Sequence, residues 1–219
     1  GVGRIVYVST INYFGNTLGR VLDETDERPV LVFVSCYDET KYRAHEAAKQ
    51  RIEKGAPAII VQPGSVYGRG DHSIVGQMIS DAATGRLRMK MFPETGFNLV
   101  YVDDVVDGIL LAHDKGVVGE CYVLGGEIST MGDLVDKAAG LSGRKAPRLT
   151  LPPVLARVSA PFGPLIGRAM GLPPNMRELI AASDGVTYWA KDDKARRELG
   201  YRPRSLDEGL RELLSPSAS

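Results

Sequence analysis

Tyr37 and Lys41 stand four residues apart, and this spacing places two side chains on one face of a helix, one turn from each other. A free phenol has a pKa of about 10, so it exchanges protons poorly at neutral pH. A lysine ammonium beside it favours the phenolate and lowers that pKa toward the working range. The pair therefore suggests an acid/base unit that protonates a carbonyl oxygen as hydride arrives, or deprotonates an alcohol as hydride leaves.

The surrounding sequence predicts a strand, a helix and a strand that would hold this pair in place. Residues 4–8 are rich in β-branched and aromatic residues and predict a short buried strand. Ser35, with an acidic residue three positions later, is the expected N-cap of a helix over residues 36–54 that stops at Gly55. A second buried strand is expected over residues 58–61. Such a unit makes two parallel strands, whose carboxyl ends meet at one edge of a sheet.

Polar residues follow each of these strands. Ser9 and Thr10 come directly after the first strand, and the sequence Gln-Pro-Gly-Ser-Val-Tyr-Gly at residues 62–68 follows the second. Ligands of parallel sheets bind at the carboxyl ends of the strands. We therefore expect these two segments to lie on the same rim as the tyrosine–lysine helix.

Hydrophobic periodicity predicts further elements along the rest of the chain. Asp103 is the expected N-cap of the helix that contains the apolar residues 105–111. The apolar run at residues 29–34 receives no firm assignment. The other expected strands cover residues 87–91, 98–102 and 121–124, and the other expected helices cover residues 76–84, 130–141, 151–172 (interrupted by proline and glycine), 176–182, 191–199 and 206–214.

The composition argues against several classes of partner. Lysine plus arginine equals aspartate plus glutamate at 27 each, so no excess of charge would attract nucleic acid or an anionic membrane. The sequence has no uncharged apolar stretch of the roughly 18 residues that a spanning helix needs. The first eight residues do not have the pattern of a signal peptide. We expect a cytoplasmic protein with a small-molecule substrate.

Cysteines and histidines give no sign of a metal site or of a disulfide framework. Cys36 and Cys121 are far apart and belong to no CxxC motif, so two reduced cysteines are expected. The three histidines are scattered without ligand spacing. His45, on the predicted tyrosine–lysine helix, is expected to face solvent or to pack. The apolar residues from 154 to 166 are expected to line a hydrophobic substrate pocket.

Several motifs, in order along the chain, resemble those of the extended short-chain dehydrogenase/reductases, also called the NAD-dependent epimerase/dehydratase family. They are the strand that ends in Ser9-Thr10 and is followed by Phe14-Gly15, the helix motif from Tyr37 to Lys41, the loop 62–68, the sequence Val102-Asp103-Asp104-Val105 and the closing residues 197–203. Residues 122–127 and 143–147 are similar to dihydroflavonol-reductase-like and hopanoid-associated epimerase-like members.

The resemblance implies an α/β fold, a Rossmann-type parallel sheet with helices on both faces, and a smaller, mostly helical substrate domain. Residues 1–75 and 101–127 would form the dinucleotide-binding core, and residues 76–100 and 128–219 the substrate domain. The family's glycine-rich phosphate-binding motif is absent from the sequence. We therefore expect the first half of the Rossmann sheet to be missing, and with it the residues that choose between NAD and NADP.

The resemblance also implies a role for each site residue, with NAD or NADP as cofactor. Thr10 would hydrogen-bond the reacting oxygen, Tyr37 would be the acid/base, and Lys41 would also hold the ribose hydroxyls of the nicotinamide half. The remaining assignments are Ser9, Pro63, Ser65 and Val66 for the cofactor, and Asn12 and Tyr67 for the substrate.

Three functions stay open at this point. The first is an NAD(P)-dependent oxidoreductase that transfers hydride to or from a carbonyl or alcohol carbon. The second is a nucleotide-sugar epimerase or dehydratase of the same family, which Ser65 disfavours because those enzymes usually carry asparagine there. The third is a non-catalytic remnant that binds a dinucleotide, which the missing glycine motif favours and the retained Tyr37, Lys41 and Thr10 oppose. A homodimer is the expected assembly.

Overall fold

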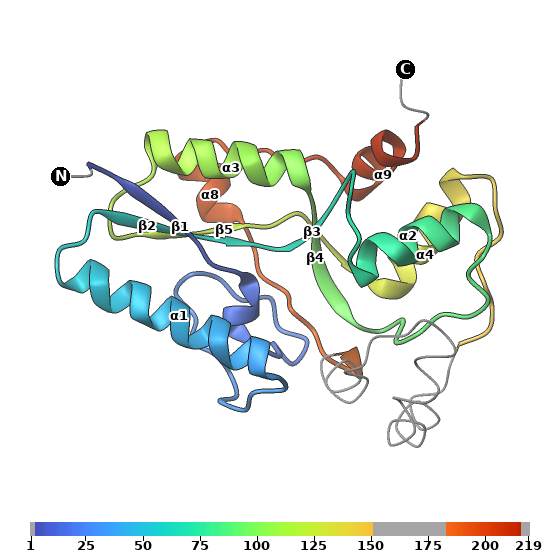
Figure 1. The fold of residues 1–219 in the computed structure, drawn as a ribbon, viewed down its shortest axis with the longest axis horizontal. Coiled ribbons are helices and arrows are strands. Elements are labelled where there is room, and N and C mark those ends of the chain that lie inside the picture. The colour runs from blue at the N-terminus through green and yellow to red at the C-terminus, as the bar shows by residue number, and fades with distance from the viewer. Residues whose placement is uncertain (1–2, 151–182, 216–219) are drawn as a thin grey trace.

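The computed structural model describes residues 3–150 and 183–215 (Figure 1). Its elements fall into two sheets with helices packed around them. In chain order they are β1 (Ile5–Val8), the 3-10 helix η1 (Ile11–Phe14), α1 (Cys36–Glu53), β2 (Ala58–Pro63), β3 (Ser65–Tyr67), α2 (Ile74–Thr84), β4 (Gly96–Tyr101), α3 (Val102–Lys115), β5 (Cys121–Leu124), β6 (Glu127–Thr130), α4 (Met131–Leu141), α8 (Asp193–Leu199) and α9 (Leu206–Leu214).

The first sheet is parallel and has the strand order β1-β2-β5. Helices α3 and α8 lie on one face, while η1 and α1 lie on the other (Figure 1). Side chains alternate between the two faces, so Tyr122 and Leu124 pack toward α3 and α8 while Val123 packs toward η1. The predicted α/β fold, with a parallel sheet covered on both faces, is confirmed.

The second sheet has the order β3-β4-β6, and its β4–β6 pair is antiparallel. Helices α2, α4 and α9 pack beside it, at the opposite end of the view from β1 (Figure 1). Strand β6 lies in a stretch for which the sequence predicted no strand. The described part of this region therefore contains a small sheet as well as helices.

Local signals set the bounds of α1. The Ser35 hydroxyl accepts a hydrogen bond from the Asp38 amide at 3.1 Å, so the predicted N-cap is confirmed. The helix ends at Glu53, and Gly55 follows with a φ of 91°, a backbone conformation that favours glycine. These two ends place Tyr37 in the first turn and Lys41 one turn later.

The predicted cap of α3 is wrong. The helix begins at Val102, directly after β4, and its N-cap Tyr101 makes no side-chain capping hydrogen bond. Asp103 therefore lies within the first turn, where its charge still favours the helix dipole. Its neighbour Asp104 is buried and forms an ion pair with Arg204 at 3.0 Å.

One further expectation differs from the structure. Residues 87–91 contain no strand, and only an isolated bridge joins Lys90 to Thr150. Residues 29–34, which received no firm assignment, form a loop. The helices predicted over residues 151–172 and 176–182, and the predicted pocket wall at residues 154–166, lie outside the described residues.

Candidate active site

A cavity of about 430 Å³ opens at the carboxyl ends of β1 and β2, beside the start of α1. This is the rim at which parallel sheets bind their ligands. The cavity brings together all but one of the predicted site residues. Those on its walls are Ser9, Thr10, Asn12, Tyr37, Lys41, Pro63, Ser65 and Val66.

Tyr37 and Lys41 reach the cavity from adjacent turns of α1. The Lys41 ammonium nitrogen lies 5.7 Å from the centre of the Tyr37 ring, so the two side chains are close, as their spacing predicts. The effect on acidity differs from the expectation. Partial burial raises the pKa of Tyr37 above its ordinary value, because loss of water around the phenol disfavours its charged form, although the residue is still 55% exposed. Tyr37 is therefore protonated at neutral pH but is a weaker acid than a free tyrosine, so proton transfer from it depends on a group that stabilises the phenolate.

Thr10 lies between β1 and η1 and serves as the N-cap of η1. Its hydroxyl oxygen accepts a hydrogen bond from the Asn12 amide at 3.2 Å. A hydroxyl that accepts one bond still has its own proton to donate. Thr10 is thus held in place by η1 and can donate to an oxygen atom in the cavity.

Ser9 is held from behind by a histidine to which the sequence assigned no role. The Ser9 hydroxyl and His45 Nδ1 share a hydrogen bond of 2.8 Å, and both residues are buried. The imidazole stacks on the ring of Tyr13 with 3.8 Å between centroids. Burial lowers the pKa of His45 to about 4, so the ring is neutral at physiological pH. Of the two expectations for His45, solvent exposure or packing, the structure shows packing. The ring also holds Ser9, a residue of the cavity wall, in place.

A buried ion pair, which the sequence did not reveal, anchors the start of α1. Arg28 binds both carboxylate oxygens of Asp38, at 2.9 and 2.7 Å, and both side chains are almost fully buried. The same guanidinium donates to the carbonyl oxygen of Asn12 at 3.4 Å. Arg28 thus ties the residue after Tyr37 to the turn that carries Asn12. Neither the residue types nor the spacing of Arg28 and Asp38, ten residues apart, predicts that the two side chains form a buried pair.

Tyr67 is the one predicted site residue that does not line the cavity. The expected contact between Tyr67 and a substrate is therefore not supported. Its side chain is 1% exposed, and its hydroxyl donates to the Leu206 carbonyl at 3.4 Å. Successive residues of a strand point to opposite faces, so residues two apart share a face. In β3 the side chains of Ser65 and Tyr67 lie on one face of the strand, and the tyrosine packs edge-on against Tyr101 in the core of the second sheet.

Five residues of the cavity wall were not among the predicted site residues. Two of them, Val8 and Gly64, stand next to predicted residues, and the other three are Ser73, Val75 and Val105. Ser73 could have been found, since it precedes an apolar run and caps α2 through a bond to the Gly76 amide. Val75 and Val105 are ordinary apolar helix residues, and only the packing of α2 and α3 brings them to the cavity.

The polar groups of the cavity fit the nicotinamide half of a dinucleotide. Serine and threonine hydroxyls, a phenol and an ammonium are the groups that hold ribose hydroxyls and a carboxamide. Pro63 has no N–H of its own. Of the residues that the structure describes, no group of three or more His, Cys, Asp or Glu side chains could hold a metal ion. No helix in the described ranges is long and apolar enough to span a membrane.

A parallel sheet with a tyrosine, a lysine and a threonine at its carboxyl rim defines a dehydrogenase-type fold. The profile described as "NAD dependent epimerase/dehydratase family" matches residues 1–125, and the chain belongs to this family.

Similar proteins have related names. A Synechocystis protein provisionally named dihydroflavonol 4-reductase is 28% identical over 96% of this chain and 63% of its own length. The 4-hydroxy-2-methyl-3-oxo-4-farnesyl-3,4-dihydroquinoline-1-oxide ketoreductase of Stigmatella aurantiaca is 30% identical over 93% of this chain and 62% of its own. A solved nucleoside-diphosphate-sugar epimerase from Pseudomonas aeruginosa is 27% identical, with a TM-score of 0.76 over 97% of this chain and 66% of its own. The chain thus spans less than two thirds of each of these two curated relatives.

Proposed function

We propose that the protein is an NAD(P)-dependent oxidoreductase of the extended short-chain dehydrogenase/reductase type, similar to dihydroflavonol reductase. It would transfer hydride between the cofactor and a carbonyl or alcohol carbon. The observation that carries the proposal is the convergence of Thr10, Tyr37 and Lys41, from two different elements, on one cavity.

In the reductive direction the residues have distinct tasks. The substrate carbonyl oxygen accepts hydrogen bonds from the Thr10 and Tyr37 hydroxyls, which polarises the carbon. As hydride forms the new C–H bond, the Tyr37 proton moves to the oxygen and leaves a phenolate, which regains a proton from solvent. Tyr37 is protonated at neutral pH and can serve as the donor, but its raised pKa opposes release of the proton and has to be offset as the phenolate forms. The Lys41 ammonium stabilises the phenolate.

The cofactor is the second part of the proposal. NADH or NADPH would supply the hydride for reduction, and NAD or NADP would accept it in the reverse direction. Lys41 would bind the ribose hydroxyls, and Ser9 would hydrogen-bond the nicotinamide half, held in place by His45. Pro63, Ser65 and Val66, which run from the end of β2 into β3, would line the carboxamide side of the cavity.

The charge of the cavity favours reduction of a neutral carbonyl compound over chemistry on a nucleotide sugar. Among its lining residues in the described part of the chain, Lys41 alone carries a positive charge. A diphosphate is normally held by arginine or by several cationic groups. With Lys41 engaged in catalysis, the lining residues that the structure describes offer no further cation to a substrate diphosphate.

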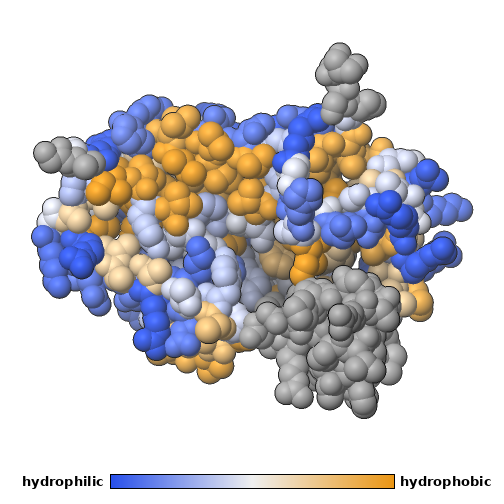
Figure 2. All heavy atoms as spheres, in the orientation of Figure 1, coloured by the Kyte–Doolittle hydropathy of each residue, from blue (hydrophilic) through white to orange (hydrophobic). Residues whose placement is uncertain are grey.

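The organisation of the whole protein completes the proposal. Residues 1–75 and 101–127 would form the dinucleotide-binding core, residues 76–100 and 128–219 would form the substrate domain, and the protein would act as a cytoplasmic homodimer. Apolar residues gather over α3 on the face shown in Figure 2, where Val106 and Leu110 are 49% and 58% exposed. An exposed apolar face of this kind suits association, which sedimentation of the full-length protein would measure.

Cofactor balance distinguishes the proposed reaction from epimerisation. The full-length protein is incubated with NADH or NADPH and a set of neutral aromatic and aliphatic ketones, and both cofactor and product are measured. A reductase consumes one reduced cofactor for each alcohol formed. An epimerase or dehydratase returns the cofactor to its starting state, so turnover of a nucleotide sugar without net cofactor change would overturn the proposal.

A further inference from the structure

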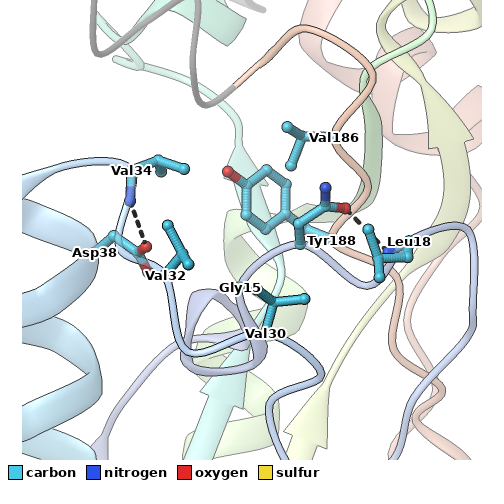
Figure 3. Close-up of a pocket in the computed structure, with 9 residues that line it drawn as sticks. Gly15, Leu18, Val30, Val32, Val34, Asp38, Val186 and Tyr188 are labelled. Carbon is cyan, nitrogen blue, oxygen red and sulfur yellow. Dashed lines mark hydrogen bonds between the residues drawn. The ribbon is translucent and has the colours of Figure 1, made fainter.

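A second cavity, of about 280 Å³, lies beside the start of α1 (Figure 3). Its walls are largely apolar. The aliphatic side chains surround the ring of Tyr188, and three of them come from the apolar run at residues 29–34, to which the sequence pattern gave no firm element. The apolar lining residues are Leu18, Val30, Val32, Val34, Val186 and Tyr188.

The loop that supplies the valines is held open by polar contacts. Val30 is 41% exposed and Val32 is 64% exposed, although apolar side chains gain free energy when they leave water. The Arg28 guanidinium binds the carbonyl oxygens of Val30 and Val32, at 3.1 and 2.9 Å. The Asp38 carboxylate accepts the Val34 amide at 3.1 Å. The apolar wall is therefore fixed in advance, which reduces the entropy cost of binding a ligand.

The charges next to this cavity are neutralised. Asp38 is part of its lining, but both carboxylate oxygens are bound by Arg28 within 3 Å. A cationic ligand would have to compete with that buried pair, and an anionic ligand would meet a carboxylate. The chemistry of the lining thus suits a neutral apolar group.

The two cavities share the elements that form them. Tyr37 lines the active-site cavity, and the next residue, Asp38, lines the apolar one. In the same way Asn12 lines the first cavity, and Gly15, which ends η1, lines the second. One ligand that extends past the start of α1 could contact both.

We propose that the apolar cavity binds a neutral apolar group of the substrate, an aromatic ring system or a short alkyl chain, while the carbonyl lies against Tyr37. This inference rests on the proposed function and names the class of its substrate. The volume is a little below the roughly 300–1,000 Å³ of sites that enclose a whole drug-sized ligand, so it suits one part of a ligand.

Binding of 2-acetonaphthone, a neutral aromatic ketone, tests the proposal without requiring turnover. The full-length protein is titrated and the shifts of its valine methyl signals are followed by NMR. Val32→Asp puts a charge on the apolar wall and should weaken binding at least about tenfold, because the ligand would lose most of its apolar contact there. Val117→Asp is the matched control, since Val117 is 56% exposed, lies in the loop between α3 and β5 and lines neither cavity, and binding should stay within about twofold.

A milder variant guards against loss of folding. Val32→Thr keeps the shape of the side chain and should weaken binding by about threefold. Tyr37→Phe should bind the ketone as well as the parent does, so a failure of the proposed hydride transfer would leave this result standing. Equal affinity in the parent and both Val32 variants, or methyl shifts centred on Val8 and Val105 in place of Val30 and Val32, would overturn the inference.

Discussion

The acidity of Tyr37 shows how much a single phenol depends on its surroundings. The tyrosine–lysine spacing predicted a lowered pKa, yet the described structure raises it through burial. The Lys41 nitrogen lies 5.7 Å from the centre of the ring. Spacing along a helix fixes which side chains are neighbours, but it does not fix how well their polar atoms are solvated.

This gives a prediction about titration. The ultraviolet absorbance of this chain is followed to alkaline pH and compared with that of Tyr37→Phe. The difference between the two curves reports Tyr37, and its midpoint should lie above the roughly 10 of a free tyrosine. A midpoint near or below that value would show that the ammonium outweighs burial, and would contradict a raised pKa for Tyr37.

His45 gives a second prediction, about stability. The folded-state pKa of about 4 is below the 6.5 of a free histidine, so between these pH values the unfolded chain binds more protons. Stability from the neutral buried ring is complete above pH 6.5 and is lost as pH falls toward 4, by up to about 3 kcal/mol. Urea unfolding at several pH values measures it. His45→Gln should show a shallower fall over this window, and an unchanged slope would contradict the assignment.

At the level of the elements, the Arg28–Asp38 pair joins the loop before α1 to the helix. Both charges are buried, so removal of one leaves the other uncompensated. Arg28→Ala should lower the free energy of unfolding by about 3–5 kcal/mol. Arg43→Ala, which removes the exposed pair with Glu39 on the same helix, should cost at most about 1 kcal/mol. Urea denaturation of the two variants makes the comparison, and similar losses would contradict the role of Arg28 as an anchor.

Most elements of the first sheet could be predicted, because their signals are local. The run at residues 58–61 is apolar on both faces, and Ser35 and Gly55 mark the ends of α1. The start of α3 could not, since β4 passes into the helix without a turn and Asp103, the expected cap, lies inside the first turn. Likewise, the exposed apolar run at residues 29–34 is held by Arg28 through contacts that no local pattern encodes.

In the candidate site, too, residues with local signals could be predicted and residues placed by long-range contacts could not. Residues at strand ends and on one helix face, such as Ser9, Thr10 and Lys41, were found because the topology of a parallel unit brings them together. Tyr67 was misassigned because a loop motif does not say how far along the segment the cavity extends: Ser65 shares the face of Tyr67 and lines the cavity, whereas Tyr67 is buried under the residues of α9. His45 was missed as a support for Ser9 because that contact joins a helix to a strand end 36 residues earlier.

At the scale of the molecule, helix α9 near the end of the chain packs onto the second sheet at a glycine. A side chain at Gly209 would collide with the hydroxyl of Tyr67. Gly209→Ala should therefore destabilise the protein by about 1–3 kcal/mol, as overpacking of a core does. Gly140→Ala, in α4, meets no atom within 4 Å and should instead stabilise by up to about 1 kcal/mol through helix propensity. Thermal unfolding of both variants tests the pair, and effects of the same sign would contradict the close packing of α9 at Gly209.

The most direct test of the proposed mechanism is the turnover of Tyr37→Phe in the full-length protein, with NADH or NADPH and a ketone that the parent reduces. Loss of the phenolic proton should lower kcat by about 10²–10⁴-fold. Tyr7→Phe makes the same change on β1, outside the active-site cavity, and should leave kcat within about twofold. Near-normal turnover by Tyr37→Phe would contradict the claim that this phenol donates the proton.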